Sequence, residues 1–147
     1  MDWGECLTKM TVKSVKLDED MVNSLIKSSE NKFKSENKLE MSDVTAGSKL
    51  SLAYDSLREL LEALALRKGY KIYNHECYTS FLKEIIGESD KGDDFDEIRK
   101  MRNAVNYYGK DITIEEADKI IARIKGLKEF VSNLLNHPLD FKQSETK

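Results

Sequence analysis

The stretch Leu50–Gly69, LSLAYDSLRELLEALALRKG, decides the fold of this chain. Its apolar residues recur every three or four positions, which is the period of an α-helix with one buried face. The stripe consists of Leu50, Ala53, Tyr54, Leu57, Leu61 and Leu64. Gly69 is a natural stop, because glycine readily adopts the left-handed conformation that ends helices. We therefore expect a helix over 42–68, with Ser42 as its N-cap, at the centre of the fold.

Four more segments carry the same helical period. They cover 18–38, 74–87, 93–108 and 113–136. Thr113 and Glu116 have the spacing of a capping box at the start of the last one. No segment alternates like a β-strand, and we expect GESDKGDD, over 87–94, to be a flexible acidic loop. The pattern predicts an all-α, single-domain antiparallel bundle of four to five helices, with its core over 18–136 and a loose tail over 138–147.

Length and composition favour one soluble globular domain. The chain has 147 residues, of which 39% are hydrophobic and 35% charged, and such a length fits one domain. The formal net charge of −3 excludes a strongly basic surface, so contact with nucleic acid must come from a local patch. The N-terminal residues do not resemble a signal peptide, and no apolar run approaches about 18 residues, so we expect no membrane contact and a cytoplasmic location.

The two cysteines give no sign of a metal site. Cys6 and Cys77 lie far apart in the sequence and have no metal-ligand spacing, and a reducing compartment is the default expectation for such a chain. We therefore predict no metal and no cofactor.

The helix expected over 93–108 has an apolar face and a polar face. Four side chains fall within an arc of about 80° on a helical wheel and are expected to be buried: Ile98, Met101, Val105 and Tyr108. The arc beside them contains Arg99, Arg102, Asn103 and Asn106, with Tyr107 just beyond it. Arginine binds phosphate bidentately, asparagine bonds to bases or sugar hydroxyls, and tyrosine stacks on bases. This face is a candidate site for RNA or a nucleotide, although a charged helix face is more often only solvated.

Two stretches suggest a family. AYDSLRELLEALALRKGYKIYNHECYTSFL, over 53–82, is followed by IRKMRNAVNYYG, over 98–109. From Ala53 to Phe130 the chain resembles the HEPN family (higher eukaryotes and prokaryotes nucleotide-binding domain). The stretch over 53–82 resembles the family's second and third helices. The stretch over 98–109 resembles the helix that carries the family motif, an arginine followed after four to six residues by a histidine.

The resemblance implies a small helical bundle that forms a two-fold homodimer, with the motif helices of both subunits lining one cleft. Many such proteins are metal-independent ribonucleases of toxin–antitoxin pairs. Many are encoded beside a minimal nucleotidyltransferase that pairs with them, and others are binding modules without activity. By position, Arg102 and Asn103 match the start of the motif, but Tyr107 and Tyr108 stand where the histidine would be. Both tyrosines are candidates for nucleotide attachment by a transferase partner, and Tyr107 is the better one because it lies off the apolar stripe.

Replacing histidine by tyrosine disfavours nuclease chemistry. RNA cleavage needs proton transfer near neutral pH, which suits histidine with its pKa of about 6.5 better than tyrosine with its pKa of about 10. We therefore expect a nucleotide- or RNA-binding module, or a nucleotidyltransferase partner, with weak or no nuclease activity. The alternatives are a ribonuclease that uses Arg102 with Tyr107 and a plain helical interaction module. His75, in the sequence NHE, can act with Arg102 if it faces the cleft and is otherwise a solvated residue of a first helical turn.

Overall fold

The computed structural model describes residues 1–137, and the expected tail over 138–147 lies outside the described residues. In chain order the elements are α1 (Trp3–Thr8), β1 (Val12–Ser14), α2 (Glu19–Lys38), α3 (Ala46–Arg67), β2 (Tyr70–Ile72), α4 (Glu76–Ser80), the π-helical turn η1 (Phe81–Ile85), α5 (Ser89–Tyr107) and α6 (Ile114–Asn136). The all-α prediction is confirmed, because helices make up nearly all of the regular structure in this part of the chain.

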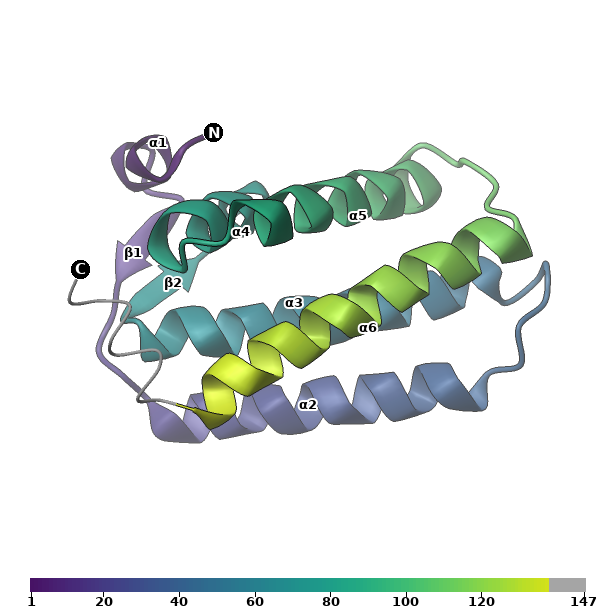
Figure 1. The fold of residues 1–147 in the computed structure, drawn as a ribbon, viewed down its shortest axis with the longest axis horizontal. Helices are drawn as coiled ribbons and strands as arrows, with labels where there is room; N and C mark the ends of the chain where they lie inside the picture. Colours follow the sequence, from purple (N-terminus) through teal and green to yellow (C-terminus); the bar gives the residue numbers. More distant parts are fainter. Residues whose placement is uncertain (138–147) are drawn as a thin grey trace.

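The central helix is α3, as its apolar stripe predicts. Tyr54, Leu57 and Leu61 are completely buried, and Leu64 is 1% exposed. Figure 1 shows α2 running along one side of α3, α5 along the other, and α6 crossing it on the diagonal. The loop from α2 to α3 and the loop from α5 to α6 lie at the same end of the bundle, and the N-terminal segment and the small sheet lie at the opposite end.

One chain covers the apolar surface of α3 by itself. Its contacts are to α2, α5, α6 and β2, and fourteen of its residues are buried. The sequence offers one reason to expect a dimer, because a helix that is apolar over much of its circumference is hard to cover in a small bundle. Because α3 is covered within one chain, this reason no longer applies, and the expectation of a homodimer rests on the family resemblance alone.

The start of α3 differs by one turn from the expected start. The helix begins at Ala46 after Thr45. The N-cap is Thr45 rather than the predicted Ser42, although the Ser42 Oγ accepts from the Thr45 N–H at 3.2 Å and its carbonyl accepts from the Ala46 N–H. The turn over 43–45 therefore separates the predicted cap from the regular helix.

A two-stranded sheet was not expected from the sequence. β1 and β2 pair antiparallel, with Val12 opposite Ile72 and Lys13 opposite Lys71. Val12 and Ile72 are buried against the bundle. Each strand has only three residues, which is too short for a recognisable alternation, and their pairing depends on segments that meet only in the folded chain.

The acidic loop predicted over 87–94 is wrong. Gly87 has φ +82° and ends the preceding turn, but α5 already begins at Ser89. Gly92 is buried inside α5, where a Cβ atom would lie 3.0 Å from the carbonyl oxygen of Thr79 on α4. This glycine therefore permits a close approach of two helices, because its missing side chain leaves room for the α4 backbone.

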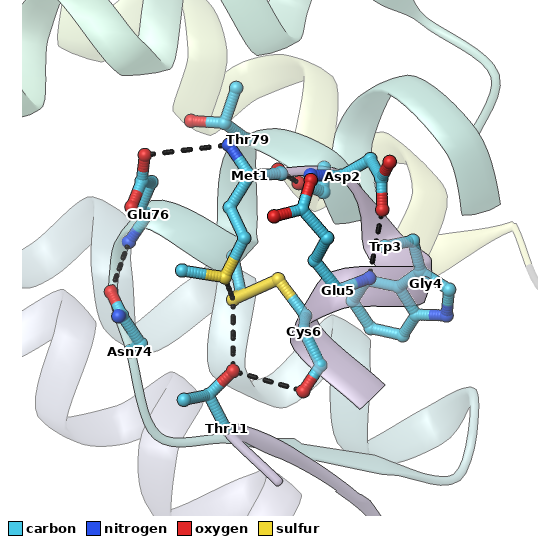
Figure 2. The surroundings of a disulfide bond; sticks show 12 residues. Met1, Asp2, Trp3, Gly4, Glu5, Cys6, Thr11, Asn74, Glu76 and Thr79 are labelled. Carbon is cyan, nitrogen blue, oxygen red and sulfur yellow. Dashed lines mark hydrogen bonds and ion pairs between the residues drawn. A yellow bond between two sulfur atoms is a disulfide. The ribbon is translucent and has the colours of Figure 1, made fainter. Parts of the chain in front are cut away.

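The two cysteines form a disulfide, which the sequence analysis missed. Cys6 of α1 is joined to Cys77 of α4, with their Cα atoms 6.2 Å apart. Figure 2 shows the N-terminal residues Met1 to Cys6 beside Asn74, Glu76 and Thr79. The Trp3 N–H donates to Glu84 at 2.7 Å, and the Thr11 hydroxyl lies 3.0 Å from the Cys6 carbonyl oxygen and 3.3 Å from the Cys77 sulfur. A disulfide is typical of oxidising compartments and of hyperthermophile proteins rather than of the reducing setting expected here. The cytoplasmic location therefore stays a prediction.

No helix of residues 1–137 is long and apolar enough to cross a membrane.

Candidate functional site

Arg102 lies between two tyrosines at the interface of α3 and α5. Its guanidinium carbon is 4.9 Å from the ring centre of Tyr54 and 5.2 Å from that of Tyr107. Tyr54 comes from the buried stripe of α3, whereas Tyr107 is the last residue of α5 and is 67% exposed. The cation is therefore held between an inner ring that belongs to the core and an outer ring that faces solvent.

The polar contacts of Arg102 leave its charge incompletely paired. Nη1 donates to the Tyr107 hydroxyl at 3.0 Å and makes a longer contact of 3.4 Å with Oδ1 of Asn103. The nearest carboxylate is that of Asp55, whose Oδ1 lies 3.9 Å from Nη2. Nε is buried without a hydrogen-bond partner in the described structure. The side chain is only 13% exposed, and a charge with so little solvent around it interacts more strongly with an anion than an exposed one does.

An imidazole reaches the same cluster from α4. His75 immediately precedes α4, and its Nδ1 lies 3.1 Å from the Tyr54 hydroxyl. The start of α4 is set by Asn74, whose Oδ1 accepts from the Glu76 N–H at 2.9 Å. Contacts from Arg102 to Tyr54 and from Tyr54 to His75 thus connect α5, α3 and the start of α4. His75 takes part although it lies in a different segment of the sequence from the motif.

Burial and nearby cations keep His75 neutral. Desolvation lowers its pKa, and the positive charges of Arg58 and Arg102 lower it further, with Asp55 acting in the opposite direction. Burial also raises the pKa of Tyr54 to about 12, so this phenol remains protonated at neutral pH. The site therefore holds an uncharged imidazole and an uncharged phenol beside fixed positive charge.

Arg58, Tyr54 and Asp55 are site residues that the sequence analysis did not assign. Tyr54 was counted only as a core residue, and Arg58 follows it by one helical turn on the same face of α3. Arg58 donates to Glu62 at 2.8 Å. The sequence did contain a sign of this site. Arg58 is a polar residue one turn after a tyrosine of the apolar stripe, and such a residue must face another polar group or solvent.

The remaining residues of the predicted polar face have separate partners. Arg99 donates to Asp96 at 2.8 Å, and this contact together with Lys100 holds the pKa of Asp96 below its usual value despite partial burial. Asn106 accepts from the Ser51 hydroxyl of α3 at 3.0 Å. Arg99 is close enough to influence His75 and Tyr54 electrostatically, whereas Asn106 serves to join α5 to α3.

The predicted burial of Tyr108 is wrong. Its side chain is 83% exposed, because α5 ends at Tyr107 and Tyr108 is already the C-cap. Gly109 has φ +67° and terminates the helix as expected. The helical-wheel prediction treated Tyr108 as part of the helix. Beyond the last helical residue, side chains no longer follow the rotation of about 100° per residue. Tyr107 and Tyr108 are therefore both open to solvent, and burial does not distinguish them as modification candidates.

Other groups that could have joined the site do not. Glu59 pairs with Lys32 at 3.0 Å on the α2 side of α3, and Glu76 lies 3.5 Å from the amino nitrogen of Met1. Among residues 1–137 no group of three or more histidine, cysteine or acidic side chains is arranged to hold a metal ion.

A sizeable groove lies elsewhere. A groove of about 550 Å³ between α2 and α6 is lined by Ile26, Phe33, Leu60 and Lys128, among others. The Lys128 ammonium sits 3.6 Å from the Phe33 ring centre, and burial lowers its pKa to about 8. None of the predicted site residues lines this groove, so the groove and the cluster of polar site residues lie in different parts of the fold. We give more weight to the Arg102 cluster, because it brings together a cation, an imidazole and exposed aromatic side chains.

The arrangement around Arg102 suits an anion that also carries a planar group. The guanidinium supplies donors for a phosphate, and Tyr107 offers an exposed ring for stacking. Comparisons of the chain with models of protein families, with curated proteins and with solved structures found no match.

Proposed function

We propose that the protein is a HEPN-like helical module that binds the phosphate of RNA or of a nucleotide at Arg102. The observation that carries this proposal is the guanidinium clamped between Tyr54 and Tyr107 with its Nε unpaired. A cation pre-positioned in this way loses little rotamer freedom on binding, and its planar fork matches two phosphate oxygens. The exposed Tyr107 ring can move outward to admit the phosphate and then stack on the base.

Binding can be measured with fluorescein-labelled RNA or a labelled nucleotide by fluorescence anisotropy. Arg102→Ala should abolish binding, and Arg102→Lys should restore only part of it, because lysine keeps the charge but loses the planar fork. Arg123→Ala is the matched control, since this arginine lies on α6 with its own carboxylate partners. Equal affinity in Arg102→Ala and the unmodified protein would rule out the proposed site.

The homodimer and the nucleotidyltransferase partner belong to the same proposal and come from the family resemblance. Light scattering at micromolar concentration tests the dimer, and affinity purification of tagged protein from its native host tests for a transferase. Tyr107 and Tyr108 are both exposed, which supports their accessibility to a modifying enzyme. Mass spectrometry of the co-expressed pair would then show nucleotide on the peptide over 103–110, and its absence would count against modification.

RNA cleavage is a second candidate, and the position of His75 favours it. If Nδ1 of His75 donates to the Tyr54 hydroxyl, Nε2 carries the lone pair of a neutral imidazole. Nε2 would take the proton of a ribose 2′-hydroxyl, whose oxygen attacks the adjacent phosphorus while the bond to the 5′-oxygen breaks. Tyr107 would give its proton to that leaving oxygen, and Arg102 would stabilise the charge on the phosphorus oxygens. The products are a 2′,3′-cyclic phosphate and a 5′-hydroxyl.

Incubation with mixed RNA distinguishes cleavage from binding alone. A cleaving protein should yield cyclic phosphate ends and should lose this activity in His75→Gln, with RNA affinity retained. No cleavage by the unmodified protein, or full cleavage by His75→Gln, would exclude the mechanism. If Arg102→Ala changes neither binding nor cleavage, the remaining function is that of a plain helical interaction module.

A further inference from the structure

The outer face of the small sheet carries two lysines and a tyrosine. Val12 and Ile72 point into the bundle, so the alternation of the strands places Lys13 and Lys71 on the opposite, outer face. These two lysines are directly opposite each other in the register. Tyr73, two residues after Lys71, shares that face and is 58% exposed. The sheet therefore shows an aromatic ring beside a pair of like charges.

One of the two lysines lacks a carboxylate partner within residues 1–137. Like charges directly opposite in a sheet destabilise it. Lys71 has Glu62 at 2.5 Å, but within residues 1–137 no carboxylate pairs with Lys13. Both ammonium groups instead lie over the Tyr73 ring, at 5.7 Å for Lys13 and 6.0 Å for Lys71. A phosphate bound between them would relieve the repulsion and leave the ring free to stack.

A line of contacts along α3 connects this face to the Arg102 cluster. Tyr54, Arg58 and Glu62 are spaced four residues apart and so lie on one side of the helix, over about 12 Å at 1.5 Å per residue. Tyr54 contacts Arg102 at one end, and Glu62 contacts Lys71 at the other. Figure 1 shows the sheet at the end of the bundle where α3 finishes and the last turn of α5 at the end where α3 begins.

Each end of this line combines an exposed tyrosine ring with cations. At one end an exposed tyrosine, Tyr107, has Arg102 over its ring, and at the other the exposed Tyr73 has lysines over its ring. We propose that the sheet face formed by Lys13, Lys71 and Tyr73 is a second stacking platform, and that the ligand is an unpaired RNA strand that reaches from one platform to the other. This proposal rests on the function proposed above, because the strand is anchored at Arg102.

Unpaired RNA is the ligand that fits both platforms at once. Its phosphates suit the cations, and its unstacked bases suit exposed aromatic rings. A mononucleotide can occupy only one platform, and the bases of a duplex are already stacked on each other.

Anisotropy titrations with oligouridylates of increasing length, from two to eight nucleotides, test the proposal. Tyr73→Leu should weaken binding of the longest strand about tenfold, as expected for loss of one base–aromatic stack, and leave the dinucleotide unaffected. Tyr73→Phe should restore the affinity because it keeps the ring. Lys13→Ala should lower the slope of log affinity against log salt by about 0.7, whereas the matched control Lys16→Ala should not.

The outcomes separate this proposal from the function on which it rests. If Arg102→Ala abolishes binding at every length while Tyr73→Leu changes none, the Arg102 site stands and the second platform is refuted. If Arg102→Ala binds every length normally, or the unmodified protein binds none, both fail. Equal affinity for the longest strand and for an RNA duplex of the same length would also overturn the platform.

Discussion

Replacing Lys49 by methionine should strongly destabilise the protein. Lys49 lies on α3 with its side chain 9% exposed, and its ammonium is 3.2 Å from the Glu36 carboxylate, which is 3% exposed. The same ammonium donates to the carbonyl oxygens of Glu36 at 2.7 Å and Leu39 at 2.6 Å. It therefore neutralises a buried acid and caps the last turn of α2, whose carbonyls lack helical partners.

The magnitude follows from what the substitution leaves behind. Methionine fills a similar volume but leaves the Glu36 carboxylate buried without a cation, and removal of one partner from a buried pair typically costs about 3–5 kcal/mol. The second carboxylate oxygen, Oε2, already lacks a hydrogen-bond partner, so no other hydrogen bond compensates, and Lys128 is the remaining cation that acts on Glu36. Replacing both residues by methionine should be less harmful than the sum of the two single changes, because no isolated charge then remains.

Urea unfolding followed by far-ultraviolet circular dichroism measures the effect. With a slope of about 2 kcal/mol per molar urea, the midpoint of Lys49→Met should fall by about 2 M. Lys38→Met is the matched control, since Lys38 is exposed near the same helix end, and its stability should change by less than about 0.5 kcal/mol. A loss below about 1 kcal/mol in Lys49→Met would refute the reasoning and show that the ammonium is solvated.

Four further outcomes are expected. Gly92→Ala should lower the free energy of unfolding by about 1–3 kcal/mol in urea, because the added methyl group meets the α4 backbone; an unchanged midpoint would contradict the close approach. Because the pKa of His75 is lowered in the folded state, protonation favours the unfolded chain, so the free energy of unfolding should fall as the pH drops below about 6.5. The fall should be smaller in His75→Gln, and a fall of equal size in this variant would contradict the assignment to His75. Reduction of the Cys6–Cys77 bond, which joins residues 71 positions apart, should lower the free energy of unfolding by about 2–4 kcal/mol. A variant with both cysteines replaced by serine should be unaffected by the reductant. Carbon-13 methyl labelling should show Lys128 titrating at about 8, and a value near that of free lysine would disprove its burial.

The helices were predictable because their signals are local. The stripe of α3 identifies the central helix, and the capping box of Thr113 and Glu116 forms at the start of α6 as expected. Gly87 and Gly109 end their helices through positive φ angles. Such features depend on neighbours within one or two turns, so one sequence is enough to read them.

The candidate site was predictable only in part. Arg102 and Tyr107 were both assigned to the site from the sequence, but their contact was not predictable, because residues five apart do not face each other on a regular helix. Tyr54 and His75 come from other elements, and their positions depend on how α3, α4 and α5 pack. The HEPN resemblance, and with it the nuclease, dimer and transferase expectations, stays a prediction.

By itself the sequence determined the positions of the four long helices, the most deeply buried one, and the end of α5 that displays arginine and tyrosine, because hydrophobic period and helix caps act over a few residues; the fifth expected helix, over 74–87, is only the short α4 followed by the π-helical turn η1. Tertiary structure alone decided that Cys6 meets Cys77, that two three-residue segments pair as strands, and that an imidazole stands beside the arginine. Each of these depends on contacts between residues far apart in the chain, whose partners are chosen when helices pack and close the intervening loops.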